Sequence, residues 1–495
     1  MVINTDAIRL ALSAQTKGSK KAQLGQFLTP SSVARFMASL FSSGSFSKCR
    51  LLDPGAGIGT LSAAFLDRCV ASKLSFHQID VDAFEIDNLL QPHLHRTLEA
   101  YRSHINCGVK VWNTDFVEAA ASSLAGDIFA RPLPKYTHAI LNPPYRKIRS
   151  DSVHRSILRR VGIETVNLYS AFVALSLGLL EEGGQLVAII PRSFCNGPYY
   201  RPFRELMLSR AALKHLHLFH ARNKAFRDDN VLQENIIIQL ERGQQQGSVT
   251  VSASTDDSFS DFVSRDYPFD SIVFPDDAER FIRVPTALNM APAIQAATLM
   301  SSLADLDISV STGPVVDFRV RQHLRQVPES GSVPLLYPGH FSGERFEWPK
   351  DKFRKPNAIM LNAETEKWLY PKGFYTVVRR FSSKEERRRI VASVVDPAAF
   401  PDAEWLGFEN HLNVFHCERR GLPEDIAYGL TAFLNTRALD TYFRSFNGHT
   451  QVNATDLRQL RYPSLVLLSR LGRWVRKNPQ ADPDQVDEKV MAITA

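Results

Sequence analysis

An asparagine and a tyrosine flank two prolines in the segment Asn142-Pro143-Pro144-Tyr145. Each proline restricts its own backbone and that of the residue before it, so the segment is rigid and extended. We expect the side-chain amide of Asn142 and the carbonyl of Pro143 to lie side by side, with the ring of Tyr145 beneath them. Such a site can accept two hydrogen bonds from a planar amine and stack against its ring. The alternative is a loop that only ends a strand.

A second candidate site is the glycine-rich segment Asp53–Gly59, with the sequence DPGAGIG. Its glycines allow a sharp turn and the close approach of a ligand to the backbone. Their spacing differs from that of dinucleotide-binding loops, and the lysine of a phosphate-binding P-loop is absent. Glu85 follows the next apolar run, where an acidic side chain can accept both ribose hydroxyls of a nucleoside. Together the glycine-rich segment and Glu85 predict a nucleoside site. Alone, the glycine-rich segment also fits a simple turn, and Glu85 also fits a surface acid.

The elements that would position these residues alternate between strand-like and helical patterns. This alternation predicts an α/β fold with a mostly parallel central sheet, whose sites gather at the carboxyl ends of the strands. Asp53, Glu85, Asp115 and Asn142 each lie at such an end. The expected strands are Cys49–Leu52, Phe76–Phe84, Val109–Trp112, His138–Leu141, Gln185–Ile190 and Val231–Leu240, and the expected helices are Thr60–Ala71, Asn88–Ile105 and Leu168–Leu180.

The character of the sequence changes after Arg242, where this alternation is lost. The stretch Gly243–Pro285 is polar and rich in turn-forming residues, so we place a domain boundary near residue 285. The predicted domains are 1–285 and 286–495, the second with a mixed α+β fold. Its expected elements are strands at Phe374–Phe381, Arg389–Val395 and Leu412–Phe415 and a single amphipathic helix at Ile426–Phe446.

Composition narrows the class of protein. The chain has 495 residues, 44% hydrophobic and 22% charged, which is typical of a globular protein of two domains. A net charge of +7 suits a phosphate-rich partner. Five dispersed cysteines predict neither a disulfide scaffold nor a metal site. The longest apolar run, Leu168–Leu180, is too short to cross a bilayer, and the first residues do not resemble a signal peptide, so we expect a soluble cytoplasmic protein.

With these motifs in this order, the chain resembles the N6-adenine DNA methyltransferases of bacterial restriction–modification systems. It is similar to their gamma class, in which the cofactor motifs precede the catalytic motif and the recognition domain comes last. The resemblance extends over nearly the whole chain. Further segments that resemble family motifs are Gln26–Pro30, Asp115-Phe116, Asn167–Tyr169, Phe226 before Val231–Asn235, Ser311–Arg319 and Asn447–Asn453.

This resemblance implies a Rossmann-like methyltransferase domain that binds S-adenosylmethionine and flips an adenine out of double-stranded DNA. Asn142, Pro143 and Tyr145 would be catalytic, and the target base would stack between Tyr145 and Phe226. No metal ion is expected. The cofactor-binding residues would be Thr29, Pro30, Asp53, Gly55, Ala56, Gly57, Glu85, Asp115, Phe116 and Asn142.

The second domain, as the target-recognition domain, should hold the duplex through basic and amide side chains. Two arginine clusters flank the polar turn 382–386 and would lie near each other on a hairpin; the alternative is a solvated basic face. His449, Gln451 and Asn453 either read base edges or cap a helix that begins near Thr455. The predicted DNA-binding residues are Arg319, Arg379, Arg380, Arg387, Arg388, Arg389, His449, Gln451 and Asn453.

Two other functions stay open from the sequence. Methyltransferases of protein glutamine side chains also carry N-P-P-Y, but normally lack a large basic C-terminal domain. A non-catalytic DNA-binding subunit could keep the fold, although the intact site residues argue against it. Cytosine C5 methylation would need a Pro-Cys pair, whereas Cys195 follows Phe194, and N4-cytosine enzymes usually begin the catalytic motif with serine. A separately encoded restriction endonuclease is a further partner that the resemblance suggests.

Overall fold

The computed structural model of the chain describes residues 3–15, 28–219, 234–284, 301–342, 345–382, 386–447 and 451–494. The chain divides into two compact units, Met1–Val284 and Pro285–Ala495. Each has its own sheets and its own buried core. No helix among the described residues combines the length and the apolar surface that crossing a membrane requires.

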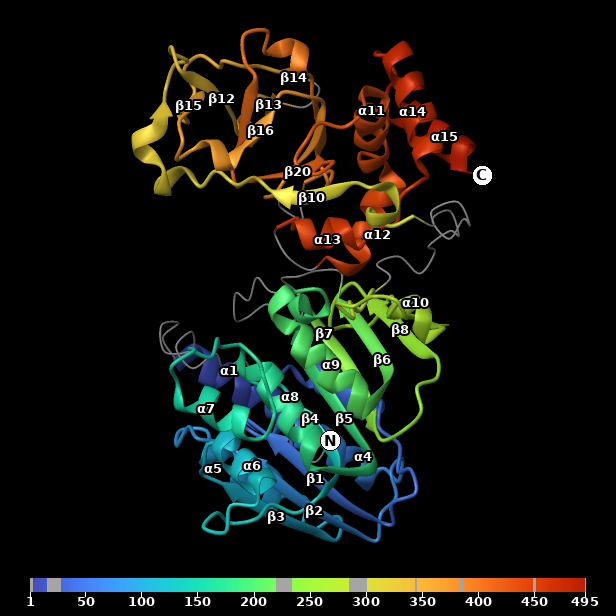
Figure 1. Ribbon diagram of the computed structural model, residues 1–495. Helices are drawn as coiled ribbons and strands as arrows, with labels where there is room; N and C mark the ends of the chain where they lie inside the picture. Colours follow the sequence, from blue (N-terminus) through green and yellow to red (C-terminus); the bar gives the residue numbers. More distant parts are fainter. Residues whose placement is uncertain are drawn as a thin grey trace. The chain divides into compact units, whose positions relative to one another are not determined.

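The first unit is built on a nine-stranded sheet in the order β3-β2-β1-β4-β5-β7-β6-β8-β9 (Figure 1). The strands from β3 to β5 are parallel, and β7 is antiparallel to both of its neighbours. The predicted α/β fold with a mostly parallel central sheet is therefore confirmed. The strands are β1 (Lys48–Pro54), β2 (Gln78–Phe84), β3 (Cys107–Trp112), β4 (Tyr136–Leu141), β5 (Leu180–Pro191), β6 (Ala211–Phe219), β7 (Asn235–Arg242), β8 (Val249–Ser254) and β9 (Val263–Tyr267).

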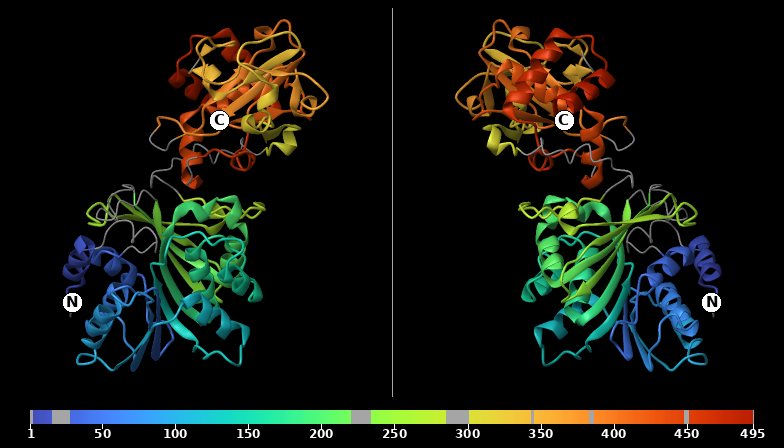
Figure 2. Two further views of the ribbon diagram at one scale, coloured as in Figure 1. Left: turned by 90° about the vertical axis from the view of Figure 1, so that its left-hand side faces the viewer. Right: turned by 90° about the vertical axis from the view of Figure 1, so that its right-hand side faces the viewer.

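Helices cover both faces of this sheet. In Figure 2 the blue helices lie on one side of the strands and the teal and green helices on the other. Phe65 and Leu94 belong to the core under α4 and α5, and Phe116 and Val173 to the core under α6 and α8. Because side chains fill both faces, a ligand can approach the sheet at the strand ends. The helices are α1 (Thr5–Gln15), α3 (Ser31–Ser39), α4 (Thr60–Val70), α5 (Gln91–Glu99), α6 (Phe116–Ala125), α7 (Val153–Arg160), α8 (Leu168–Leu179), α9 (Arg201–Arg210) and α10 (Phe269–Ile272).

Strands β6, β8 and β9 were not predicted from the sequence. The β6 segment contains His215 and His217, and the segments of β8 and β9 are rich in serine and charged residues, so all three look polar. In the structure both histidines are buried and share the hydroxyl of Ser252 on β8, at 2.7 and 2.8 Å. Buried polar side chains are tolerated when they find partners on a neighbouring strand. Such a pairing cannot be read from the period of apolar residues.

The second unit combines a four-stranded antiparallel sheet, β10-β20-β17-β18, with a five-stranded sheet, β11-β15-β12-β19-β16. The predicted hairpin is present as β17 and β18, although β18 begins at Ala392 and not at Arg389. The main strands of the second unit are β10 (Ser309–Thr312), β11 (Leu324–Arg325), β12 (Ser332–Leu336), β15 (Ala358–Met360), β16 (Leu369–Pro371), β17 (Tyr375–Arg379), β18 (Ala392–Val395), β19 (Trp405–Phe408) and β20 (Leu412–His416). A short pair is formed by β13 (Phe341–Ser342) and β14 (Arg345–Phe346). The helices are α11 (Glu424–Leu434), α12 (Arg437–Phe446), α13 (Ala454–Arg458), α14 (Leu465–Lys477) and α15 (Pro483–Thr494).

The single helix predicted at Ile426–Phe446 is wrong, because the chain breaks between α11 and α12. The side chain of Asn435 pairs with the backbone of Ala392, accepting its N–H and donating to its carbonyl oxygen, both at 3.0 Å. Thr436 then caps α12 by accepting the N–H of Leu439. Both residues favour such side-chain bonds to the backbone over a continuous helix.

Two glycines bring α11 and α14 into close contact. A Cβ atom on Gly429 would lie 1.9 Å from the carbonyl oxygen of Leu468, and one on Gly472 would lie 1.8 Å from the carbonyl oxygen of Asp425. Backbone atoms cannot rotate away as side chains do, so any side chain here must separate the helices.

We predict that Gly472→Ala lowers the free energy of unfolding of the second unit by about 1–3 kcal/mol or more, because the added methyl overpacks this contact. Trp474 on α14 reports the transition by fluorescence during urea unfolding. Gly247→Ala is the matched control, since no atom lies within 4 Å of its Cβ position. Equal unfolding midpoints for the two variants would show that the helices do not pack as described.

Candidate active site

The carboxyl ends of β1, β2 and β4 meet at a cavity of about 200 Å³. Parallel pairing puts these three ends at one edge of the sheet. The cavity has aromatic side chains on its walls and a few polar groups among them, which is the usual form of a small-molecule site. Of the predicted cofactor-binding residues, those that line it are Gly55, Gly57, Glu85, Asp115, Phe116 and Asn142.

A hydrogen bond joins the glycine-rich loop after β1 to the acidic residue after β2. The backbone N–H of Gly57 donates to Oε2 of Glu85 at 2.9 Å, and the N–H of Asp87 donates to Oε1 at 2.7 Å. Gly57 has a φ of 58°, and a Cβ atom there would lie 3.0 Å from the side chain of Leu28, so another residue would strain the loop. Glu85 is buried, and this burial raises the pKa of its carboxyl despite the two N–H donors.

Asp53, at the end of β1, is fully buried. The hydroxyl of Ser62 on α4 donates to its Oδ2 at 2.6 Å. Its other oxygen, Oδ1, has no hydrogen-bond partner among the described residues. Burial raises the pKa of Asp53 to about 7, and the nearby charge of Glu85 adds to this effect, although the bond from Ser62 opposes it. A buried acceptor in this position is costly unless a ligand satisfies it.

The side-chain amide of Asn142 is held from two sides. Its Nδ2 donates to Oγ1 of Thr29 at 3.0 Å, and the hydroxyl of Tyr145 lies 3.1 Å from its Oδ1. The same hydroxyl lies 3.2 Å from the carbonyl oxygen of Ile189. Burial raises the pKa of Tyr145, so its hydroxyl keeps the proton that it donates. The amide is therefore fixed at the cavity before any substrate arrives.

His154 on α7, which the sequence analysis did not single out, completes the polar wall of the cavity. Its Nε2 lies 3.0 Å from Oδ2 of Asp115, whose Oδ1 caps α6 by accepting the N–H of Val117. The hydrogen bond to Asp115 raises the pKa of His154. Burial alone would raise the pKa of Asp115, but the bond from His154 and the backbone donors outweigh it and lower this pKa. A carboxylate oxygen accepts more than one hydrogen bond, so Oδ2 can take a further donor from the cavity.

The remaining predicted residues of the first unit flank this cavity. Thr29 and Pro30 are buried just before α3, and Thr29 reaches the site through its bond to Asn142. Ala56 and Pro143 are buried in their loops. Within the described ranges, no group of three or more histidine, cysteine or acidic side chains is placed to hold a metal ion. The residues of the predicted motifs that lie outside the described ranges are Gln26, Phe27, Phe226, Val231, Leu232, Gln233, Gly448, His449 and Thr450.

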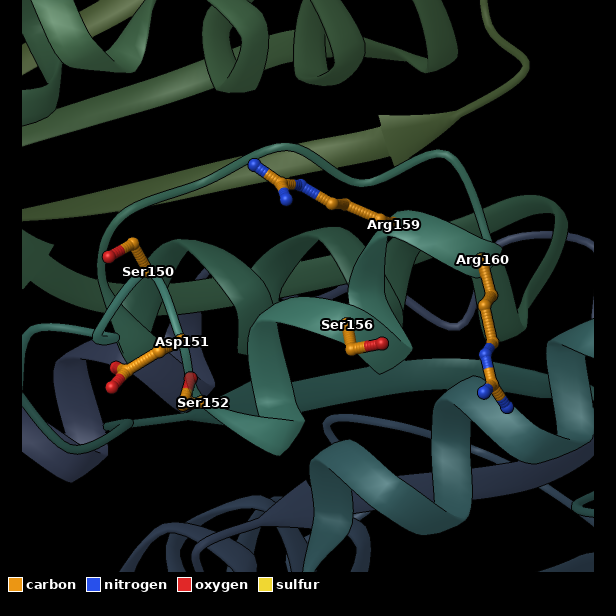
Figure 3. A pocket seen from close by; sticks show the side chains of 6 residues that line it. All are labelled: Ser150, Asp151, Ser152, Ser156, Arg159 and Arg160. Atoms are coloured by element: carbon orange, nitrogen blue, oxygen red, sulfur yellow. The ribbon is translucent and has the colours of Figure 1, made fainter.

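A second, more open hollow of about 420 Å³ lies along α7. Figure 3 shows Arg159 and Arg160 pointing away from each other, with residues 150–152 on the segment before the helix. Arg159 is paired with Glu164 at 3.1 Å. This hollow contains none of the predicted site residues, whereas six of the predicted cofactor-binding residues line the cavity at the sheet edge, which is the candidate active site.

In the second unit, segments far apart in the sequence meet at one end of the four-stranded sheet. β10 and β17 are both antiparallel to β20, so their ends lie beside its start. Phe381 bridges to Gln451, and Val315 bridges to Glu409. The segments 313–319, 379–382, 409–411 and 451–453 are called the loop cluster below. Arg319, Arg379, Arg380, Gln451 and Asn453 belong to it.

Arg389 is not on the surface where DNA binding was predicted. It is 1% exposed, and its guanidinium donates to Oγ of Ser382 at 3.1 Å and to Oδ1 of Asn447 at 3.0 Å. Its backbone N–H also donates to Asp440 at 2.6 Å. The structure thus corrects the expectation for this residue, because its donors hold the loop after β17 to the end of α12 and cannot reach a phosphate.

The other predicted DNA-binding residues differ in exposure and in their partners. Arg379 forms an ion pair with Glu386. Asn453 begins α13, and both its backbone N–H and its side-chain amide donate to Asp456, at 2.9 and 3.3 Å, so the helix-capping interpretation fits this residue. Those exposed are Arg319 and Arg387, and those half-buried are Arg379, Arg380, Arg388, Gln451 and Asn453.

Fold and site together define a Rossmann-like methyltransferase, and comparisons with known proteins refine this class. Residues 70–226 match the family model described as Eco57I restriction-modification methylase. The chain is 51% identical to the type II methyltransferase M.BsuBI of Bacillus subtilis, covering 96% of this chain and 94% of the relative. It is 43% identical to the type II methyltransferase M.PstI of Providencia stuartii, covering 93% of this chain and 91% of the relative.

The solved structure of the type IIL restriction-modification enzyme MmeI in complex with DNA shares the fold, with a TM-score of 0.51 and 10% identity over 90% of this chain and 69% of that one. Given the relatives above, the chain belongs to the type II methyltransferases of restriction–modification systems. The predicted membership of the restriction–modification methyltransferases is confirmed, and the alternatives of protein glutamine methylation and a non-catalytic subunit gain no support.

The buried carboxyl of Asp53 yields a prediction for stability against pH. Because its pKa is raised from 3.8 to about 7, the folded chain keeps this proton between about pH 4 and pH 7, whereas the unfolded chain releases it. The contribution of Asp53 to stability therefore falls as the pH rises through this window. Asp53→Asn should become more stable relative to the unchanged chain over the same window, by on the order of 4 kcal/mol in total.

Urea unfolding of both proteins at several pH values measures this difference. Asp402→Asn, at an exposed aspartate, is the control. A constant difference from pH 4 to pH 7 would mean that Asp53 is ionised in the folded chain across this range.

Proposed function

We propose that this enzyme transfers the methyl group of S-adenosylmethionine to N6 of an adenine in double-stranded DNA. The observation that carries the proposal is the amide of Asn142, fixed between Thr29 and Tyr145 beside the cavity at the ends of β1 and β2. A rigid amide acceptor next to a nucleoside-sized cavity suits an aromatic amine as the methyl acceptor. When bound, S-adenosylmethionine supplies an electrophilic methyl group on a positively charged sulfur.

The residues around the cavity fit this cofactor. The carboxylate of Glu85, which the N–H groups of Gly57 and Asp87 help to orient, can accept hydrogen bonds from ribose hydroxyls. Oδ2 of Asp115 can accept an exocyclic amine, and the ring of Phe116 offers an apolar surface for a purine. The unsatisfied Oδ1 of Asp53 is a buried acceptor that suits the positively charged amino group of the methionine part. Each of these groups is in place without the ligand, which reduces the cost of ordering on binding.

Asn142 and Pro143 would act on the target amine. Its lone pair is delocalised into the adenine ring, so it is a poor nucleophile. Acceptance of its two hydrogens by Oδ1 of Asn142 and the carbonyl of Pro143 would localise this lone pair and aim it at the methyl group. The ring of Tyr145 would stack on the base, and we propose Phe226 for the opposite side. Alignment of this kind can lower a barrier by about 7–11 kcal/mol at most.

The second unit would recognise the duplex through the loop cluster. The exposed guanidinium of Arg319 and the half-buried Arg380 supply positive charge there. Phosphate contacts by such residues position a protein on DNA without reading the sequence. We place the enzyme in the cytoplasm, acting beside a separately encoded restriction endonuclease.

We predict that Asn142→Ala lowers kcat for DNA methylation by about 100-fold or more, because the amine loses its fixed acceptor. The dissociation constant for S-adenosylmethionine should change by less than threefold, which corresponds to a change in binding free energy of about 0.6 kcal/mol. Transfer of labelled methyl groups to DNA and calorimetry with the cofactor measure the two quantities. Asn106→Ala, at an exposed asparagine before β3, is the control. A kcat within tenfold of the unchanged enzyme would contradict the role of Asn142.

We further predict that Glu85→Ala weakens cofactor binding at least tenfold, since charge-assisted hydrogen bonds contribute about 1.5–3 kcal/mol each. Glu99→Ala, at an exposed glutamate of α5, is the matched control. If calorimetry gives the same dissociation constant for Glu85→Ala as for this control, the ribose contacts lie elsewhere.

A further inference from the structure

The turn between β19 and β20 places a buried carboxylate behind a surface imidazole. The side chain of Glu409 has no exposed surface, whereas that of His411 is 43% exposed. The backbone N–H of His411 donates to Oε2 of Glu409 at 3.0 Å, and its ring Nδ1 lies 2.5 Å from Oε1. Among the described residues, His411 is the only cation-forming side chain within 4.0 Å of this carboxylate.

Neighbouring segments of the loop cluster hold this turn in place. The N–H of Leu412 closes it by donating to the carbonyl oxygen of Glu409 at 3.0 Å. The N–H of Asn410 donates to Val315 at 2.9 Å, and the N–H of Arg380 donates to the carbonyl oxygen of His411 at 2.8 Å. His411 is thus presented on a rigid backbone and not on a loose loop.

The orientation of the imidazole is fixed as well. Because Nδ1 faces Glu409, the other ring nitrogen, Nε2, lies on the far side of the ring. Nε2 makes no hydrogen bond within the part of the chain that the structure describes. The ring of Phe381 packs against the imidazole with 5.1 Å between the centroids. Two neighbouring buried atoms, Nε of Arg380 and Oδ1 of Asn410, also lack partners among the described residues.

We propose that His411 reads the edge of a base pair in the DNA that this enzyme recognises, with Glu409 as the positioning residue that holds its ring. The proposal rests on the proposed function, since it assigns a residue of the second unit to sequence choice. Neither residue was singled out from the sequence, because a Glu-Asn-His turn has no distinctive spacing.

The charge of the pair favours a base edge over a phosphate. Electrostatic attraction to a phosphate depends on positive charge, and the carboxylate of Glu409, 2.5 Å from the ring of His411, makes this pair a weak source of it. Glu409 instead fixes the orientation of the His411 ring and therefore the position of Nε2. Direct readout depends on a donor or acceptor at a defined position in a groove. Arg319 and Arg380, in the same cluster, supply the charge that the backbone of DNA attracts.

The test begins with the cognate site, which mapping of methylated bases in DNA from cells expressing the chain identifies. We then compare kcat/KM for the cognate duplex with that for duplexes changed at one base pair. His411→Ala should reduce the discrimination at one base pair by roughly 5- to 150-fold, the range for loss of one direct contact. The slope of log affinity against log salt should stay unchanged. His104→Ala, at an exposed histidine near the start of β3, is the control.

Glu409→Gln tests the positioning role, because glutamine keeps the size of the side chain but cannot hold the Nδ1 proton as a carboxylate does. It should reduce discrimination at the same base pair, and the double variant should be no worse than His411→Ala alone. A purely structural role for the pair would lower activity on all duplexes equally and keep their ratios, which would overturn the proposal.

A phosphate contact would also overturn the proposal. His411→Ala would then weaken binding to every duplex and reduce the salt slope by about 0.9. If the unchanged enzyme methylates no DNA at all, the proposed function fails. If it methylates DNA and His411→Ala keeps every ratio, only the assignment of His411 fails.

Discussion

The active site depends on the parallel alignment of β2, β1 and β4. Parallel strands end at the same edge of a sheet, so residues of β1 become neighbours of residues 30 positions away on β2 and 87 positions away on β4. The bond from the N–H of Gly57 to Glu85 then ties the first strand end to the second. Without this alignment, the glycine loop, the acid and the amide of Asn142 would be three unrelated surface features.

The polar side chains of the site are also preorganised. Glu85, Asp115 and Asn142 are each oriented by hydrogen bonds from the protein, so little order remains to be imposed on binding. Burial raises the pKa values of Asp53 and Glu85, which shows that the fold places these acids where their charged forms are costly. Acids with raised pKa values are common at functional sites, because a bound ligand can replace the interactions with water that a carboxylate loses on burial. The Glu409–His411 pair in the second unit has the same organisation, with a buried carboxylate directing an exposed group.

The sequence was most informative where chemistry and periodicity coincide. Apolar runs predicted β1, β2, β4 and β5. Glu85 and Asn142, the polar residues that follow β2 and β4, line the cavity, and Asp53 at the end of β1 flanks it. β6 was missed because His215 and His217 look polar until Ser252 is brought beside them. The break before α12 and the burial of Arg389 were missed for a related reason. Asn435 and Arg389 are defined by partners more than 40 residues away, and no local pattern reveals such partners.

His154 and His411 illustrate the same limit on the functional side. Each is paired with an acid, but Asp115 lies 39 residues from His154, and Glu409 lies two residues before His411 in a turn that reveals nothing until it is folded. Motifs therefore located the reacting groups, whereas tertiary contacts were needed to find the residues that orient them.

In the proposed reaction, the fixed amide of Asn142 directs methyl transfer to an adenine amine. The most direct measurement is to incubate the purified enzyme with duplex DNA and S-adenosylmethionine labelled in its methyl group, and to identify the labelled nucleosides by mass spectrometry after complete digestion. We expect label in N6-methyldeoxyadenosine and in no other nucleoside. Label in N4- or C5-methyldeoxycytidine would contradict it.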